Sequence, residues 1–118
     1  MTRFSLDEIK KSKAASELNF INRGIEKESL RVSPFGQISQ TKHPIGLGAA
    51  LTNPYITTDF SEALLELVTP TFTSASDCLK FLSNLHIFVN QNLEEESLWP
   101  LSMPCVIEAE EDIPIGNY

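Results

Sequence analysis

The stretch EALLELVT, residues 62–69, decides the fold because it is a short apolar run that stops at Pro70. Its length and apolar character predict a largely buried strand, although Ala, Leu and Glu are good helix formers. Successive side chains of a strand point to opposite faces. One face therefore carries Ala63, Leu65 and Leu67, and the other carries Glu62, Leu64, Glu66 and Val68.

Glu66 is the unexpected residue of this strand, because its neighbours on both sides are apolar. A buried carboxylate is costly unless it is paired, protonated or bound to a cation. Magnesium suits such a place, since it takes oxygen ligands from one or two carboxylates and fills its other positions with water and phosphate oxygens. Asp59 is near in sequence, but on an unbroken strand it would point to the opposite face. The two acids converge only if residues 59–62 bend or bulge.

A second acidic pair lies in NRGIEKESLRV, residues 22–32, where β-branched and charged residues predict another strand. Glu26 and Glu28 point the same way, roughly 7 Å apart. They share that face with Leu30 and Val32, so acidic and apolar residues do not segregate by parity. Pairing with basic neighbours such as Arg31 is the simpler explanation, and a bound cation is the alternative.

The clearest helix covers residues 75–94, where Ser74 and Asp77 form a capping pair. Its apolar residues recur at spacings of three and four, which predicts one broad face packed on a sheet. They are Cys78, Phe81, Leu82, Leu85, Phe88, Val89 and Leu93. The acidic run 94–96 is expected beyond the helix end, because negative charge is unfavourable there.

The other segments predict shorter elements. Ser5 and Glu8 cap a helix over residues 5–20, whose weak stripe runs through Leu6, Ile9, Lys13 and residues 16–20. Further expected elements are a turn at 34–36 with a return strand at 37–39, a short helix at 44–52, a strand at 55–58, an extended edge segment after residue 99 and a loop at 107–118. The sequence therefore predicts an α+β fold.

Composition narrows the function. The chain has 118 residues, one domain's worth, with 42% hydrophobic residues, a net charge of -7 and a pI near 4.7. This charge repels phosphate backbones and anionic lipid, so we expect neither a nucleic-acid nor a membrane-surface partner. The start lacks a signal-peptide core and no run has the length of a membrane span. We therefore expect a cytoplasmic protein in which Cys78 and Cys105 stay reduced.

Other chemistries have weaker support. His43 and His86 lack partners at zinc-ligand spacing and read as structural residues. Cys105 has no histidine near it in sequence, which favours a packed cysteine over a nucleophile. Gly46 and Gly48 are not followed by the Gly-Lys-Ser/Thr of a phosphate loop.

Three motifs in this order resemble bacterial-type glutamate-cysteine ligases. They are RGIEKESLRV at 23–32, TTDFSEALLE at 57–66 and WPLSMPC at 99–105, and the His43-Pro44 pair with the following GAALT stretch is also similar. The motifs depart from the family only by conservative changes such as lysine for arginine at position 27. Together they cover residues 23–105, which makes the resemblance specific.

The resemblance implies an ATP- and magnesium-dependent ligase that joins the side-chain carboxylate of L-glutamate to L-cysteine through an acyl phosphate, the first step of glutathione synthesis. It implies that Glu26, Glu28, Asp59 and Glu66 hold metal, and that Phe60 lines the pocket for the cysteine side chain. It also implies part of a glutamine synthetase-like fold, with a curved, mainly antiparallel sheet and helices on one face.

The family's chains are several times longer than this one. By resemblance, residues 1–118 are the amino-terminal part of a single catalytic domain, and the phosphate-binding arginines would lie elsewhere. We therefore expect the isolated chain to be inactive and to self-associate. Two alternatives stand beside the ligase: a non-catalytic binding or regulatory module of the same fold, and a related ligase with another amine acceptor.

Overall fold

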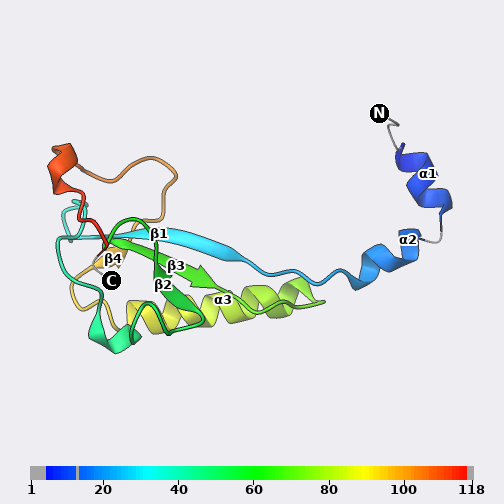
Figure 1. The fold of residues 1–118 in the computed structure, drawn as a ribbon, viewed down its shortest axis with the longest axis horizontal. Coiled ribbons are helices and arrows are strands. Elements are labelled where there is room, and N and C mark those ends of the chain that lie inside the picture. The colour runs from blue at the N-terminus through cyan, green and yellow to red at the C-terminus, as the bar shows by residue number, and fades with distance from the viewer. Residues whose placement is uncertain (1–4, 13, 117–118) are drawn as a thin grey trace.

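The structure is a computed structural model that describes residues 5–12 and 14–116. These residues form an α+β fold around a four-stranded sheet in the order β2-β3-β1-β4, in which every neighbouring pair is antiparallel (Figure 1). The strands are β1 (Glu26–Val32), β2 (Ile56–Thr58), β3 (Leu64–Val68) and β4 (Ser97–Leu98). The predicted fold class and the two main strands are confirmed.

The register of the sheet brings the two acidic motifs together. Glu28 on β1 lies opposite Glu66 on β3, and Thr57 on β2 lies opposite Glu66 from the other side. Opposed residues of an antiparallel pair place their side chains on the same face. One face of the sheet therefore receives the acids of both motifs.

The other face is covered by α3 (Ala75–Asn90), which lies along the sheet in Figure 1. The Ser74 side chain accepts a hydrogen bond from the Asp77 backbone at 3.2 Å, which confirms the predicted cap. The helix ends at Asn90, earlier than the predicted end at 94, and the acidic run 94–96 lies beyond it as expected. Its buried residues are Cys78, Leu82, Leu85 and Val89, and most of them join Leu47, Ile56, Leu65, Leu67 and Leu93 in the main core. Phe88 remains 43% exposed, so the apolar face is narrower than predicted.

A second, smaller core forms where the hairpin after β1 meets the carboxyl-terminal segment. Its buried residues are Val32, Ile38, Ala63 and Cys105. Ala63 is fully buried, as Leu65 and Leu67 are, but it packs in this smaller core, and β3 begins one residue later at Leu64. Cys78 and Cys105 are free thiols in separate parts of the fold.

The predicted helix over residues 5–20 is broken into α1 (Leu6–Lys11), α2 (Ala14–Glu17) and the 3-10 turn η1 (Leu18–Phe20). The capping box of Ser5 and Glu8 is present. Ser12 then adopts an extended backbone and its hydroxyl donates to the Ile9 carbonyl, which ends α1; Lys13 lies outside the described residues. Neither helix buries a residue, and both lie away from the sheet in Figure 1. A stripe without a packing partner gives little stability to a continuous helix.

Several shorter predictions hold only in part. The return strand at 37–39 is reduced to isolated bridges after a turn in which Gly36 has φ 77°, and 44–52 contains only the 3-10 turn η2 (Ile45–Leu47). The edge strand β4 comes before Pro100 rather than after Trp99, because proline cannot donate to a ladder. The segment 107–116 is loop with a 3-10 turn, η3 (Glu110–Asp112), and residues 117–118 lie outside the described residues.

Arg31 joins these segments from the buried side of β1. Its side chain is fully buried, and Nη1 lies 2.6 Å from Glu96 Oε2. Nη1 also donates to Thr41 Oγ1, while Nη2 donates to the backbone oxygens of Thr41 and Glu62 at 2.8 and 2.9 Å. Ser39 and Thr41 donate to the second oxygen of Glu96. One guanidinium thus ties β1 to the hairpin, to the turn before β3 and to the loop after α3.

We predict that Glu96→Ala lowers the free energy of unfolding by about 3 kcal/mol or more, because it leaves a buried guanidinium without its counter-charge. Urea unfolding followed by circular dichroism measures the change. Glu95→Ala is the matched control, since Glu95 is the exposed neighbour. Equal stability of the two variants would contradict a structural role for the pair.

Candidate functional site

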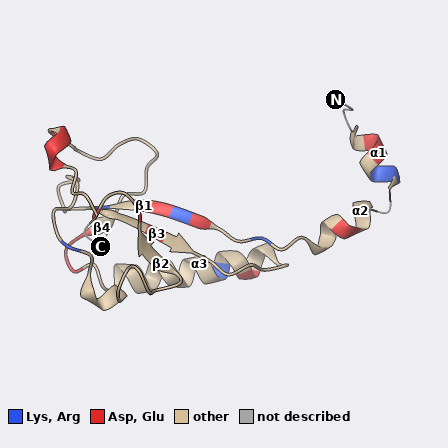
Figure 2. Ribbon diagram, in the orientation of Figure 1, with Lys and Arg blue, Asp and Glu red and all other residues tan. Residues whose placement is uncertain are grey.

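The candidate site is the face of the sheet opposite α3. Leu65 and Leu67 of β3 pack into the core beneath α3, so Glu66 between them points to the other face. Glu28, its cross-strand partner, and Glu26 point the same way from β1. Figure 2 shows an acidic, a basic and a second acidic band along β1, where Lys27 points to the helix side between the two acids. Glu26 and Glu28 are exposed and Glu66 is partly exposed.

Glu66 is therefore less buried than the sequence predicts. The prediction treats both sides of β3 as covered, but among the described residues α3 packs on only one face of the strand. The half-exposed Leu64 and Val68 flank the carboxylate on this open face.

Asp59 reaches the same face through the bend that the sequence requires. Residues 59–63 connect β2 to β3 through a bend and a turn, so Asp59 and Glu66 do not lie on one unbroken strand. Thr57 of β2 lies opposite Glu66, and Asp59, just past the end of β2, is near enough for its negative charge to raise the pKa of Glu66. The structure thus brings all four predicted acids, Glu26, Glu28, Asp59 and Glu66, to one side of the sheet.

The charges of these acids act on one another. Partial burial raises the pKa of Glu66 above its ordinary value of 4.5, and the negative charges of Glu26, Glu28 and Asp59 raise this pKa further. An acid whose pKa is raised by other acids stands in a field that attracts cations. This field is strongest when all four groups are ionised.

The donor chemistry of this face fits magnesium. All four candidate ligands are carboxylates, which supply the oxygens that this ion prefers. As the side chains stand, no group of three or more acidic, histidine or cysteine residues in the described part of the chain is arranged to hold one ion. Magnesium commonly takes only one or two protein carboxylates and completes its shell with water and substrate phosphates, so the acids suit ions that arrive with a phosphorylated substrate.

Phe60 stands beside the acids in the turn after β2. Its side chain is 68% exposed, so it has no place in either core. An exposed aromatic ring next to a charged face is a candidate contact for a ligand. The assignment of Phe60 to substrate binding remains a prediction, as does the metal role of the acids.

Comparison with known proteins assigns the family. The sequence profile described as glutamate-cysteine ligase matches residues 6–118. The chain belongs to the glutamate-cysteine ligase family. The glutamate-cysteine ligase of Edwardsiella ictaluri is 54% identical over 101 residues, 86% of this chain and 20% of the relative. That of Pseudoalteromonas translucida is 47% identical over 114 residues, 97% of this chain and 22% of the relative.

Solved structures similar to this chain agree with this assignment. The crystal structure of the glutamate-cysteine ligase from Francisella tularensis in complex with AMP has a TM-score of 0.76 at 41% identity, covering 80% of this chain and 19% of that one. A bifunctional glutathione synthetase from Pasteurella multocida has a TM-score of 0.74 at 46% identity, covering 78% of this chain and 13% of that one. The chain spans about a fifth of the length of the curated family members that it matches.

Two cavities lie outside the acid face, and sequence reasoning missed both. Lys27 and His86 line one between β1 and α3, and His43, Thr58 and Glu62 line the other. Both ring nitrogens of His43 and the Thr58 hydroxyl are buried without a partner among the described residues. The alternation of side chains along β1 places Lys27 on the face opposite Glu26 and Glu28, and this was the one feature of the sequence that pointed to the first cavity. The second depends on loop positions that periodicity does not give.

We predict that Glu66→Gln raises the stability of this chain at neutral pH. The native pKa of Glu66 is raised, so the native state binds a proton more readily than the unfolded state does, and stability falls as pH rises from about 4.5 through the native pKa. Ionised Glu66 is therefore unfavourable at neutral pH, and the uncharged amide removes this cost. Urea unfolding across pH measures the difference.

The advantage of Glu66→Gln should vanish as pH falls below the ordinary value of 4.5, where Glu66 is protonated in both states. Added magnesium should also reduce it, because a cation near Glu66 favours the ionised form. The control is Glu111→Gln, an exposed acid in the carboxyl-terminal segment. A stability difference independent of pH would mean that charge is not its cause.

Proposed function

We propose that this chain supplies the metal-holding sheet of a ligase that uses ATP to join the side-chain carboxylate of L-glutamate to the amine of L-cysteine. The products would be γ-glutamylcysteine, ADP and phosphate, and the reaction would be the first step of glutathione biosynthesis. The observation that carries the proposal is the convergence of Glu26, Glu28, Asp59 and Glu66 on one face, in a chain of the glutamate-cysteine ligase family.

The proposed chemistry has two steps. The glutamate side-chain carboxylate attacks the γ-phosphorus of ATP, forming an acyl phosphate and releasing ADP. The cysteine amine then attacks the acyl carbon, the C–O bond to phosphate breaks, and the nitrogen loses a proton. The structure of the Francisella relative in complex with AMP supports the nucleotide part of this proposal.

The acids would position magnesium ions against the phosphates of ATP. Bound magnesium would neutralise the phosphate oxygens while the phosphoryl group moves. The contribution of this chain is rigidity: Glu26, Glu28 and Glu66 stand on paired strands whose other face is fixed by α3. Side chains on a packed sheet hold their positions better than side chains on a loop.

Phe60 would line the place for the cysteine side chain. Its ring is exposed next to Asp59, which puts an apolar surface at the margin of the charged face. A polarizable sulfur packs favourably against an aromatic ring. The exposure of Phe60 in this chain leaves that surface available to a substrate.

The isolated chain should bind magnesium but should not catalyse the ligation. A phosphoryl-transfer site needs groups that hold nucleotide, metal and acceptor together, and this chain spans about a fifth of its relatives. The strands β2 and β4 stand at the edges of the sheet, and unpaired edges favour self-association, which light scattering measures. Chemistry that consumes ATP and a free thiol also suits the reducing cytoplasm, which we propose as its compartment.

No helix in the described ranges 5–12 and 14–116 is long and apolar enough to cross a membrane.

We predict that Glu66→Gln abolishes most turnover in a complete enzyme. The experiment replaces the matching segment of the Pseudoalteromonas ligase with this chain and follows ADP release that depends on both amino acids. Turnover should fall roughly 100-fold or more, since loss of even an outer-shell partner of a metal typically costs about 10- to 100-fold. Glu111→Gln in the same chimera is the control, and the chain alone should release no ADP.

A chimera with near-normal rate and magnesium dependence after Glu66→Gln would show that Glu66 holds no metal. An inactive chimera beside an active parent would instead favour a non-catalytic module. Competition among amines in the active chimera would show which amine the enzyme accepts.

We predict that Phe60→Ala in this chimera raises the KM for cysteine about tenfold while changing the KM for glutamate and ATP much less, because it removes an apolar contact made only with the thiol substrate. Phe35→Ala is the matched control, since Phe35 is 86% exposed in the hairpin turn. An equal loss for all three substrates would assign Phe60 a structural role.

A further inference from the structure

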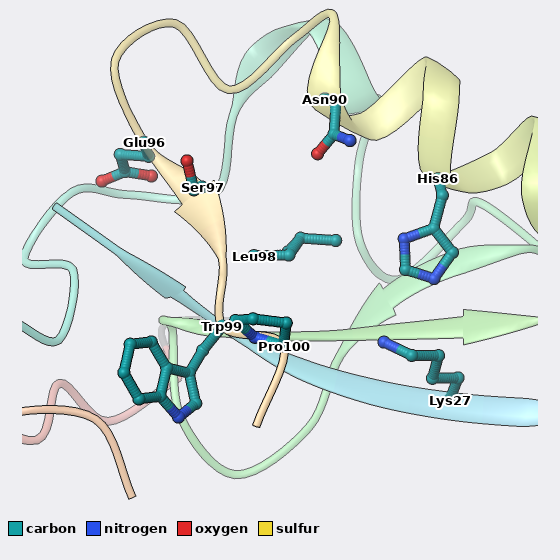
Figure 3. A pocket seen from close by; sticks show the side chains of 8 residues that line it. All are labelled: Lys27, His86, Asn90, Glu96, Ser97, Leu98, Trp99 and Pro100. Carbon is teal, nitrogen blue, oxygen red and sulfur yellow. The ribbon is translucent and has the colours of Figure 1, made fainter. Parts of the chain in front are cut away.

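A cavity of about 470 Å³ opens between α3 and the strands β1 and β4, on the side of the sheet away from the acids (Figure 3). Known small-molecule sites have volumes of about 300 to 1,000 Å³. Lys27 reaches this cavity from β1, His86 and Asn90 reach it from α3, and Leu98 reaches it from β4. None of these residues belongs to the proposed metal site.

One end of the cavity carries a positive charge without a counter-charge. Lys27 Nζ donates to Ser29 Oγ at 2.5 Å, and no carboxylate in the described part of the chain forms an ion pair with it. Burial lowers the pKa of Lys27, as expected for an ammonium that lacks a nearby anion. Figure 3 shows the Lys27 nitrogen and the His86 ring pointing toward each other.

His86 adds a hydrogen-bond donor at the same end. Burial lowers the pKa of His86, and the charge of Lys27 lowers it further, so at neutral pH the imidazole is neutral and carries one N–H. The Asn90 amide lies on the next turn of α3 and lines the same cavity. This end therefore offers one cation and neutral donors.

The one carboxylate that lines the cavity is already neutralised. Glu96 pairs with Arg31 at 2.6 Å and accepts hydrogen bonds from Ser39 and Thr41. It therefore cannot act as a counter-charge for Lys27.

The remaining wall is apolar. Leu98 lies at the centre of the view in Figure 3, with Trp99 and Pro100 below it. The Trp99 ring turns away from the cavity, because its Nε1 donates to the Met103 carbonyl at 2.6 Å and the ring packs against the second core. The cavity thus combines a singly charged cationic end with an aliphatic wall of Leu98 and Pro100.

We propose that this cavity binds a small organic monocarboxylate, with the carboxylate held by Lys27 and His86 and the apolar body packed on Leu98 and Pro100. The site is separate from the proposed ligase site, because Lys27 points to the opposite face of β1 from Glu26 and Glu28. Its occupancy does not require the ligase activity.

The test uses 4-phenylbutyrate as the probe and its uncharged amide as the comparison. Isothermal titration calorimetry of the chain with 4-phenylbutyrate should give a saturable heat of binding. The amide should bind roughly tenfold or more weakly, since a hydrogen bond to a charged group is worth about that factor.

Variants separate the charge from the fold. Lys27→Met should weaken 4-phenylbutyrate binding roughly tenfold or more, Lys27→Arg should largely retain it, and Lys80→Met, an exposed position on α3, should leave it unchanged. Circular dichroism verifies that each variant is folded. Equal affinity for the acid and the amide, or no saturable heat at millimolar probe, overturns the proposal on the unmodified chain even if Lys27→Met fails to fold.

Discussion

The buried guanidinium of Arg31 is the interaction on which the rest of the structure depends. It leaves β1 on the helix side and binds Glu96, Thr41 and the backbone of Glu62, which belong to three segments that the chain must bring together. A buried charge tolerates little displacement, because loss of any partner leaves it uncompensated. Arg31 therefore fixes the position of β1, and β1 in turn fixes where Glu26 and Glu28 stand.

The alternation of β1 divides the molecule into two chemically different sides. Glu26 and Glu28 point away from α3, while Lys27, Ser29 and Arg31 point toward it. Pairing with β3 adds Glu66 to the acidic side and Leu65 and Leu67 to the helix side. One four-stranded sheet thus carries a cation-attracting face and a cationic cavity back to back, with only the thickness of the backbone between them.

Local sequence patterns predicted the two elements that form most of the main core. The short apolar run around Leu65 predicted β3, and the three-and-four spacing from Cys78 to Val89 predicted α3. The continuous helix predicted over residues 5–20 is wrong, because its apolar stripe through Leu6 and Ile9 packs against no core and Ser12 ends the first helix. The meeting of Asp59 and Glu66 depends on a turn, and the exposure of Glu66 depends on which face α3 covers. Neither the proximity of the two acids nor the exposure of Glu66 can be predicted from local sequence, because both depend on tertiary structure.

The strand order also governs the course of folding. The central strand β1 comes first along the chain, but its partners β3 and β4 come much later, so their ladder forms only after long loops close. During synthesis the ribosome releases β1 well before either partner exists. The three charged residues Glu26, Lys27 and Glu28 help to keep β1 soluble until its partners are made, since charge opposes the edge-to-edge pairing of exposed strands. Glu26 and Glu28, which we propose as metal ligands, thus also reduce the aggregation of the chain during synthesis.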